Sequence, residues 1–87
     1  MNKIDRDMIM NAKAAHVAQA AMTITDRVQH LQPGSRVLGA AAFFLLACDR
    51  YGVDAKDAFT AVTNLMVTKE GHRDEFAATK MYLENEL

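Results

Sequence analysis

Residues 37–48 have the sequence VLGAAAFFLLAC and contain no charged side chain. Arg36 precedes this run, and Asp49 and Arg50 follow it. A helix that crosses a bilayer needs about 20 consecutive apolar residues, so this shorter run indicates a helix buried in protein. We expect a helix over 36–51 that is apolar on every side and therefore occupies the centre of the fold.

The two halves of this run differ in side-chain size. Gly39 and the alanines at 40–42 make the first half thin, whereas the aromatic and leucine residues at 43–46 make the second half bulky. A thin face lets a neighbouring helix approach closely, and bulky side chains fill a core. We therefore expect a close helix contact along the first half and core packing along the second.

Turn residues divide the chain into four predicted helices. Pro33 and Gly34 mark a turn, and Gly52, Val53 and Asp54 have the order of a C-terminal glycine, an apolar residue and a new N-cap. The sustained two-residue alternation of a strand is absent from the sequence. We predict one all-α domain over 1–87, a small four-helix bundle with helices at about 5–31, 36–51, 55–67 and 72–86.

The predicted helix 5–31 carries two apolar stripes. One stripe follows alternating spacings of four and three residues and contains Met10, Ala14, Val17, Ala21, Ile24, Val28 and Leu31. The other contains Ile4, Met8, Ala15, Ala18 and Met22. Such a helix is about 40 Å long, whereas a compact domain of this size is only about 31 Å across. We predict that one stripe packs within the chain and the other meets a second subunit; the sequence leaves open which.

The composition bounds the class of protein. The chain has 87 residues, of which 51% are hydrophobic and 24% charged, as in a single small globular domain. Ten basic residues against eleven acidic ones give a net charge of −1, which argues against binding through phosphate neutralisation. The single cysteine, Cys48, fits a reducing compartment, and the first ten residues lack the apolar segment of a secretory signal. We expect a cytoplasmic protein that does not enter membranes.

The sequence contains no motif that indicates catalysis or a bound cofactor. Its three histidines are widely separated, and the context of Ser35 does not match the Gly-x-Ser-x-Gly motif of hydrolases. Glycine-rich phosphate-binding loops and metalloprotease motifs are also absent from the sequence. We predict a protein that is not an enzyme and that takes no cofactor or metal. A short chain with alanine-rich helices and no catalytic motif is typical of small bacterial and phage proteins, and these features resemble no particular family.

These observations favour a non-enzymatic protein-interaction module that acts as a homodimer, for example a small regulatory or inhibitory accessory protein with a protein partner. The alternative is a helical nucleic-acid-binding regulator that uses Arg27, Arg36 and Arg50 around the Pro33 turn. Residues 51–87 contain four basic and seven acidic residues, so the last helix would oppose phosphate with like charge. The charge distribution therefore favours the interaction module.

Overall fold

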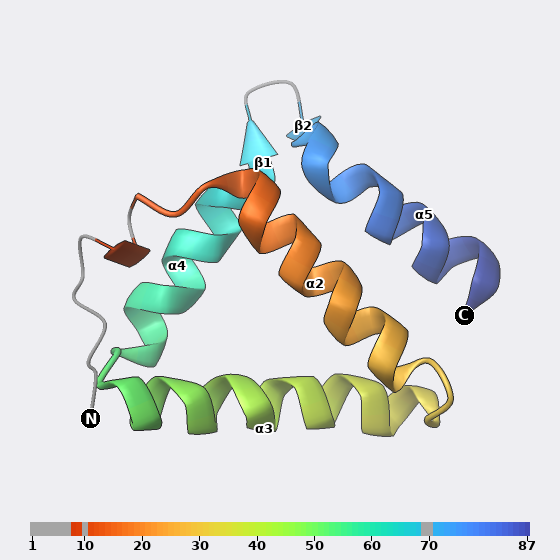
Figure 1. The fold of residues 1–87 in the computed structure, drawn as a ribbon, viewed down its shortest axis with the longest axis horizontal. Helices are drawn as coiled ribbons and strands as arrows, with labels where there is room; N and C mark the ends of the chain where they lie inside the picture. The colour runs from red at the N-terminus through yellow and green to blue at the C-terminus, as the bar shows by residue number, and fades with distance from the viewer. Residues whose placement is uncertain (1–7, 10, 69–70) are drawn as a thin grey trace.

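The computed structural model describes residues 8–9, 11–68 and 71–87. The described part of the chain is all-α, as predicted, with helices α2 (Ala14–Val28), α3 (Pro33–Tyr51), α4 (Ala55–Met66) and α5 (Ala77–Glu86) (Figure 1). The two-residue strands β1 (Val67–Thr68) and β2 (Gly71–His72) pair in antiparallel register after α4. A single turn of 3₁₀ helix, η1 (Asp74–Phe76), then leads into α5.

The helices form a flat, open arrangement. The molecule measures 37 × 31 × 18 Å, and its radius of gyration is 13.5 Å, against about 12 Å for a compact chain of this length. In Figure 1, α3 lies along one edge, α2 and α4 rise from its two ends and converge near β1, and α5 lies beside α2. Helix α2 contacts α5 and η1, whereas α3 contacts α4. The predicted four-helix bundle is not confirmed, because these helices do not enclose a shared axis.

The long N-terminal helix predicted over 5–31 is wrong. Met8 and Ile9 have helical backbone, but Asn11 lies in a turn and Lys13 has the extended backbone of an N-cap, with φ −85° and ψ 131°. Helix α2 therefore has 15 residues, which at 1.5 Å per residue gives a length of about 22 Å. Beyond the break, Ile9 and Ala12 line a hollow whose other side is formed by α4. Residues 1–7 and 10 of the predicted helix lie outside the described residues.

Helix α3 begins earlier than predicted. It starts at Pro33, because a proline in the first turn loses no hydrogen bond and its fixed φ already suits a helix. The predicted turn at Pro33 and Gly34 is thus the first turn of α3.

The predicted junction between the second and third helices is confirmed. Gly52 ends α3 in the left-handed conformation, with φ 70°, and the amide of Val53 donates to the Cys48 carbonyl over 2.8 Å. The carboxylate of Asp54 then accepts from the Asp57 amide over 3.0 Å and caps α4.

The C-terminal helix is shorter than the predicted range 72–86. Gly71 and His72 form β2, and the next residues form η1, so α5 begins at Ala77. The amide of Arg73 donates to the Met66 carbonyl over 2.8 Å, and its Nε donates to the Leu65 carbonyl over 2.6 Å. These two bonds tie the start of η1 to the end of α4, which is why the backbone at 71–73 does not join a helix.

The buried core is small. Among the described residues, Ala18, Thr25, Cys48 and Phe76 are buried. Phe76 is the largest of them, at 5% exposed, and it lines a hollow between α2, α4 and α5. The hydroxyl of Thr25 donates to the Ala21 carbonyl over 2.8 Å, so this buried polar group is satisfied within α2. Three of these four buried residues lie on α2 and η1, and the fourth, Cys48, lies on α3.

Candidate interaction surface

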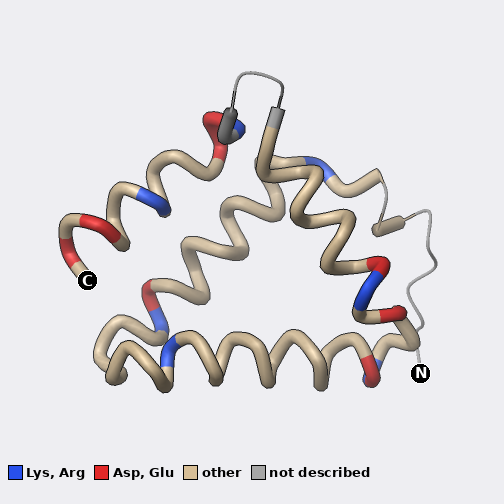
Figure 2. The backbone as a smooth tube through the Cα atoms, turned by 180° about the vertical axis from the view of Figure 1, so that it is seen from behind, with Lys and Arg blue, Asp and Glu red and all other residues tan. Residues whose placement is uncertain are grey.

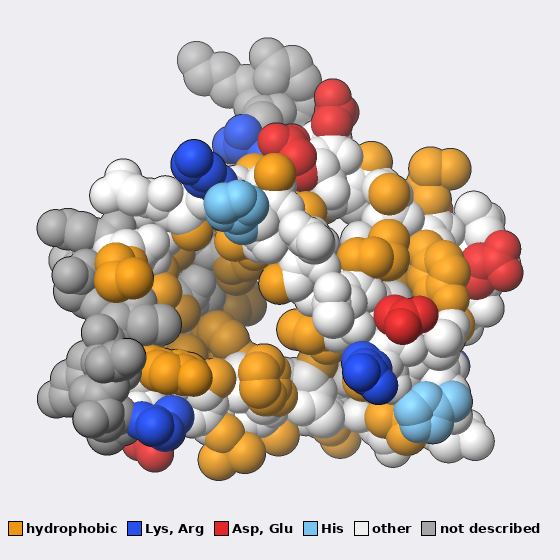
Figure 3. All heavy atoms as spheres, in the orientation of Figure 1, with side chains coloured by type: hydrophobic (Ala, Val, Ile, Leu, Met, Phe, Trp, Pro, Cys, Tyr) orange, Lys and Arg blue, Asp and Glu red, His pale blue; other side chains and the backbone are white. Residues whose placement is uncertain are grey.

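The most apolar surface of the molecule lies along α3. Its large side chains are exposed over most of the helix: Val37 69%, Leu38 72%, Phe43 61%, Leu45 56% and Leu46 70%. Figure 3 shows hydrophobic side chains along this edge, and Figure 2 shows that the charged residues of α3 are confined to its ends. The central position expected for this helix is therefore not confirmed within the single chain.

Part of the exposed surface of α3 forms one continuous apolar face, although Val37 and Phe43 are exposed at other angles around the helix. At 100° per residue, Leu38, Ala42 and Leu45 fall on a line, with Gly39 and Leu46 beside it. We call these five residues the outer face of α3. On the opposite side, Phe44 and Ala47 are half-buried and Cys48 is buried. The helix is thus bare along the outer face; on the opposite side it is covered near its C-terminal end, whereas Val37 and Ala40 are exposed.

Gly39 has no role in the packing of its own chain. Among the described residues, no atom lies within 4 Å of the position that a Cβ would take there. A glycine inside a helix costs about 1 kcal/mol relative to alanine. Nothing within the described chain offsets this cost, so the space above Gly39 is open to a side chain from outside.

The accessible surface of the chain is large for its mass. It measures 6801 Å², whereas a compact monomer of 9.6 kDa exposes about 5,100 Å². The excess of about 1,700 Å² is twice the roughly 800 Å² that each partner buries in a standard interface. This excess belongs to the open shape of the whole chain and is not confined to α3.

A polar corner fixes the angle between α2 and α3. The Nη2 group of Arg36 donates to the Gln29 carbonyl over 2.8 Å, and its Nη1 group donates to the Leu87 carbonyl over 3.5 Å. The hydroxyl of Tyr82 donates to Oε1 of Gln29 over 2.5 Å. These bonds join the end of α2, the start of α3 and α5, so the outer face of α3 is held on a fixed frame.

The three arginines proposed for nucleic-acid binding do not form one patch. Arg36 is half-buried and bonded in the polar corner, whereas Arg50 lies at the other end of α3, over the ring of Tyr51 at 5.6 Å. Fourteen residues of helix place these two about 21 Å apart along the axis. Arg27 lies on α2 and is exposed. The structure therefore does not bring Arg36 and Arg50 together into a basic surface.

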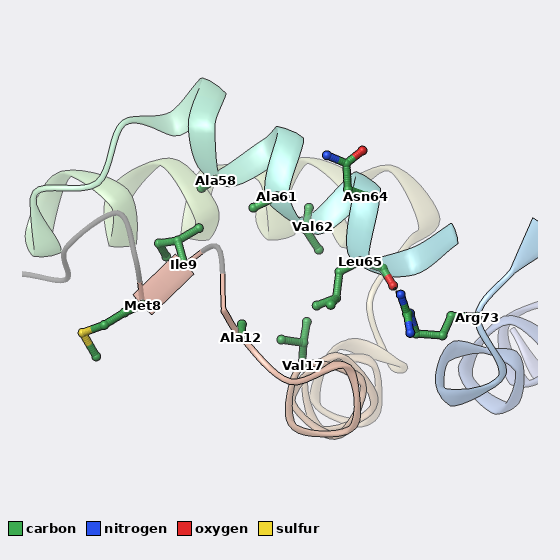
Figure 4. Close-up of a pocket in the computed structure, with 10 residues that line it drawn as sticks. All are labelled: Met8, Ile9, Ala12, Val17, Ala58, Ala61, Val62, Asn64, Leu65 and Arg73. Atoms are coloured by element: carbon green, nitrogen blue, oxygen red, sulfur yellow. Dashed lines mark hydrogen bonds between the residues drawn. The ribbon is translucent and has the colours of Figure 1, made fainter. Parts of the chain in front are cut away.

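Among the described residues, two apolar hollows lie between the helices. The first, of about 520 Å³, separates α2 and the lining residues Met8, Ile9 and Ala12 from α4; Val17 and Leu65 point toward each other across it, and Met8 points away (Figure 4). The Arg73 guanidinium at its rim is fixed by the Leu65 carbonyl. The second, of about 440 Å³, lies between α2, α4 and α5 and includes Thr25 and Lys80 among its lining residues. Neither brings together the acid, base and nucleophile that a catalytic site requires.

The part of the chain that the structure describes shows neither a metal-binding cluster nor a membrane-spanning helix. No group of three or more histidine, cysteine, aspartate or glutamate side chains is placed to hold a metal ion there. No described helix combines the length and the hydropathy required to cross a membrane.

The structure does not bring the predicted interface residues together as one exposed surface. Ala18 is buried; Ala14, Val17, Ala21, Met22 and Val28 are half-buried; Met8, Ala15, Ile24 and Leu31 are exposed; and Met10 lies outside the described residues. Val17 and Ala21 both face the hollows shared with other helices of the chain. Much of the heptad stripe is thus partly covered within the chain.

Sequence reasoning missed the exposure of the outer face of α3. The signal was present, since an uncharged helix with an interior glycine needs neighbours on every side. The prediction assigned those neighbours to the same chain. Helices α2, α4 and α5 are each shorter than α3 and leave one side of it bare.

Comparison of the chain with protein-family models, with curated proteins and with solved structures finds no match. The function must therefore be inferred from the surface itself.

Proposed function

We propose that the protein is a non-enzymatic interaction module that acts as a homodimer, with the outer face of α3 as its subunit interface. The observation that carries the proposal is the exposure of Leu38, Leu45 and Leu46 on a helix that has no charge between Arg36 and Asp49. In the dimer α3 is covered on both sides and becomes the central apolar helix of the assembly. Full burial of each such leucine stabilises by about 1.5–3 kcal/mol.

A second copy of the chain is the occupant that the net charge and the apolar composition of the outer face favour. The net charge of −1 imposes little repulsion between two identical chains. Obligate homodimers have apolar interfaces, and the outer face of α3 contains only apolar residues. Covering α3 with its own copy leaves the polar faces of α2 and α5 free.

The free faces suit a small regulatory or inhibitory accessory protein with a protein partner. Helix α5 exposes Glu84 and Glu86, and Lys80 donates to Glu84 over 2.6 Å on the same surface. An exposed helix whose two glutamates outnumber its one lysine is compatible with a basic protein surface and does not favour nucleic-acid phosphate. This surface is the part of the dimer through which we propose that it acts.

The molar mass in solution tests the proposal, measured by sedimentation equilibrium across a dilution series. We expect a dimer for the natural sequence, and a shift toward monomer for Leu38→Glu, because a buried unpaired carboxylate opposes association. Met81→Glu is the matched control, since Met81 is an exposed apolar residue on α5, at 59%, away from α3. A natural sequence that stays monomeric at micromolar concentration contradicts the proposal, and so does a Leu38→Glu variant with an unchanged dimer.

A further inference from the structure

We infer that the partner of α3 is α3 of a second copy, antiparallel to it, with the two-fold axis at Ala42. This inference rests on the proposed homodimer and adds its geometry. The line of residues that faces outward extends beyond the apolar part of the helix at spacings of three and four, and comprises Ser35, Leu38, Ala42, Leu45 and Asp49. That repeat is the contact line of a two-helix coiled-coil packing.

An axis at Ala42 pairs Gly39 with a large residue and pairs two leucines with each other. It places Leu38 opposite the partner's Leu46, and Gly39 opposite the partner's Leu45. The open space above Gly39 then receives a leucine side chain, which explains why glycine stands at that position. At the axis itself Ala42 meets the partner's Ala42, so the two backbones approach closely, as helices with small contact residues do.

The ends of the helix favour the same orientation. The antiparallel pair brings Asp49 to the N-terminus of the partner's α3, beside the partner's Ser35. That N-terminus has free backbone amides, and the side chain of its N-cap residue, Gln32, makes no hydrogen bond to the helix. A carboxylate is stabilised there by the amides and by the helix dipole. A parallel pair would instead place Asp49 beside the partner's Asp49.

The rest of the chain leaves this approach open. In Figures 1 and 2, α2 and α4 both rise from the same side of α3. The buried and half-buried residues of α3, such as Cys48 and Phe44, lie opposite the outer face. A second α3 therefore reaches the outer face without displacing another described helix.

Disulfide crosslinking tests the orientation. The variants carry Cys48→Ala, so that the introduced cysteine is the only thiol. Ala42→Cys places two thiols at the axis, within the Cβ–Cβ reach of a disulfide, and oxidised glutathione should convert most of the protein to a covalent dimer. Ala40→Cys is the matched control: Ala40 is also exposed but lies on the opposite side of α3, and we expect little covalent dimer.

A mixing experiment separates the antiparallel pair from the parallel one. Leu38→Cys and Leu46→Cys should each crosslink poorly alone and efficiently when the two variants are mixed, because each faces the other residue across the axis. In a parallel pair each would crosslink alone as well as Ala42→Cys does. That result, or efficient crosslinking of Ala40→Cys with none at Ala42→Cys, overturns the inference and leaves the dimer in place. A natural sequence that sediments as a monomer overturns both.

Discussion

Helices α2 and α3 differ in how far their own chain covers them. Helix α2 mixes apolar and polar residues, packs against α5 and η1, and buries Ala18 and Thr25. Helix α3 is far more uniformly apolar, contacts α4, and leaves Leu38 and Leu46 at least 70% exposed. The more apolar helix is thus the less covered one. The comparison teaches that hydrophobicity sets the need for burial, while the length and position of neighbouring helices decide whether the chain meets it.

The largest expected effect is a loss of folding stability in the region around α2, which the chain's own helices cover. Phe76→Ala removes the largest buried side chain and should lower the free energy of unfolding by about 3–5 kcal/mol. Denaturant unfolding followed by circular dichroism measures this loss. Phe59→Ala is the matched control, because Phe59 is 63% exposed on α4 and should cost much less. Equal losses for the two variants would show that the region around α2 is not the better packed one.

The next effect concerns α3 and should appear as a dependence of the thermal stability on protein concentration. Leu46→Glu should weaken association by about 2–4 kcal/mol, because an unpaired carboxylate is costly in an apolar interface. Thermal unfolding measured over a hundredfold range of protein concentration tests this. The midpoint of the natural protein should rise with concentration, and that of Leu46→Glu should not. A natural protein whose midpoint is independent of concentration contradicts a partner on α3.

A smaller effect depends on whether the space above Gly39 is filled. Gly39→Ala stabilises an isolated helix by about 1 kcal/mol, because alanine is the better helix former. Within the proposed pair the added methyl group meets a leucine and should weaken the dimer by a similar amount or more. Sedimentation equilibrium measures the change in dimer association, and circular dichroism measures the change in helix stability. Tighter association of Gly39→Ala would show that no side chain enters this space. Gly34→Ala is the control, because Gly34 is also open but lies outside the outer face.

The smallest effect concerns the charge at the end of α3. Asp49→Asn should weaken the dimer by about 0.3–1 kcal/mol in low salt, since the amide interacts less strongly with the partner's helix N-terminus. The difference from the natural protein should shrink as salt is added, because salt screens the exposed charge. Dissociation constants at low and high salt test both statements. A stronger dimer for Asp49→Asn would indicate like charges in contact and thus a parallel pair.

Local signals predicted much of the helical framework. The left-handed Gly52 and the Asp54 cap were both identified from residue order, because each satisfies backbone groups within a few residues. The break at 11–13 was missed, because the apolar repeat continues through it without a proline or glycine. Ile9 and Ala12 line a hollow that they share with α4, and an arrangement between residues so far apart in the sequence leaves no local signal.

The sequence by itself determined that the chain is helical, where α3 and α4 meet, and that an uncharged helix requires cover on every side. These properties depend on neighbouring residues and on hydrophobicity. The tertiary structure alone decided which side of that helix is left bare, because this depends on where α2, α4 and α5 lie in space and how far they reach. It also moved the expected contact surface from α2 to α3, since α2 packs against the chain's own C-terminal segment.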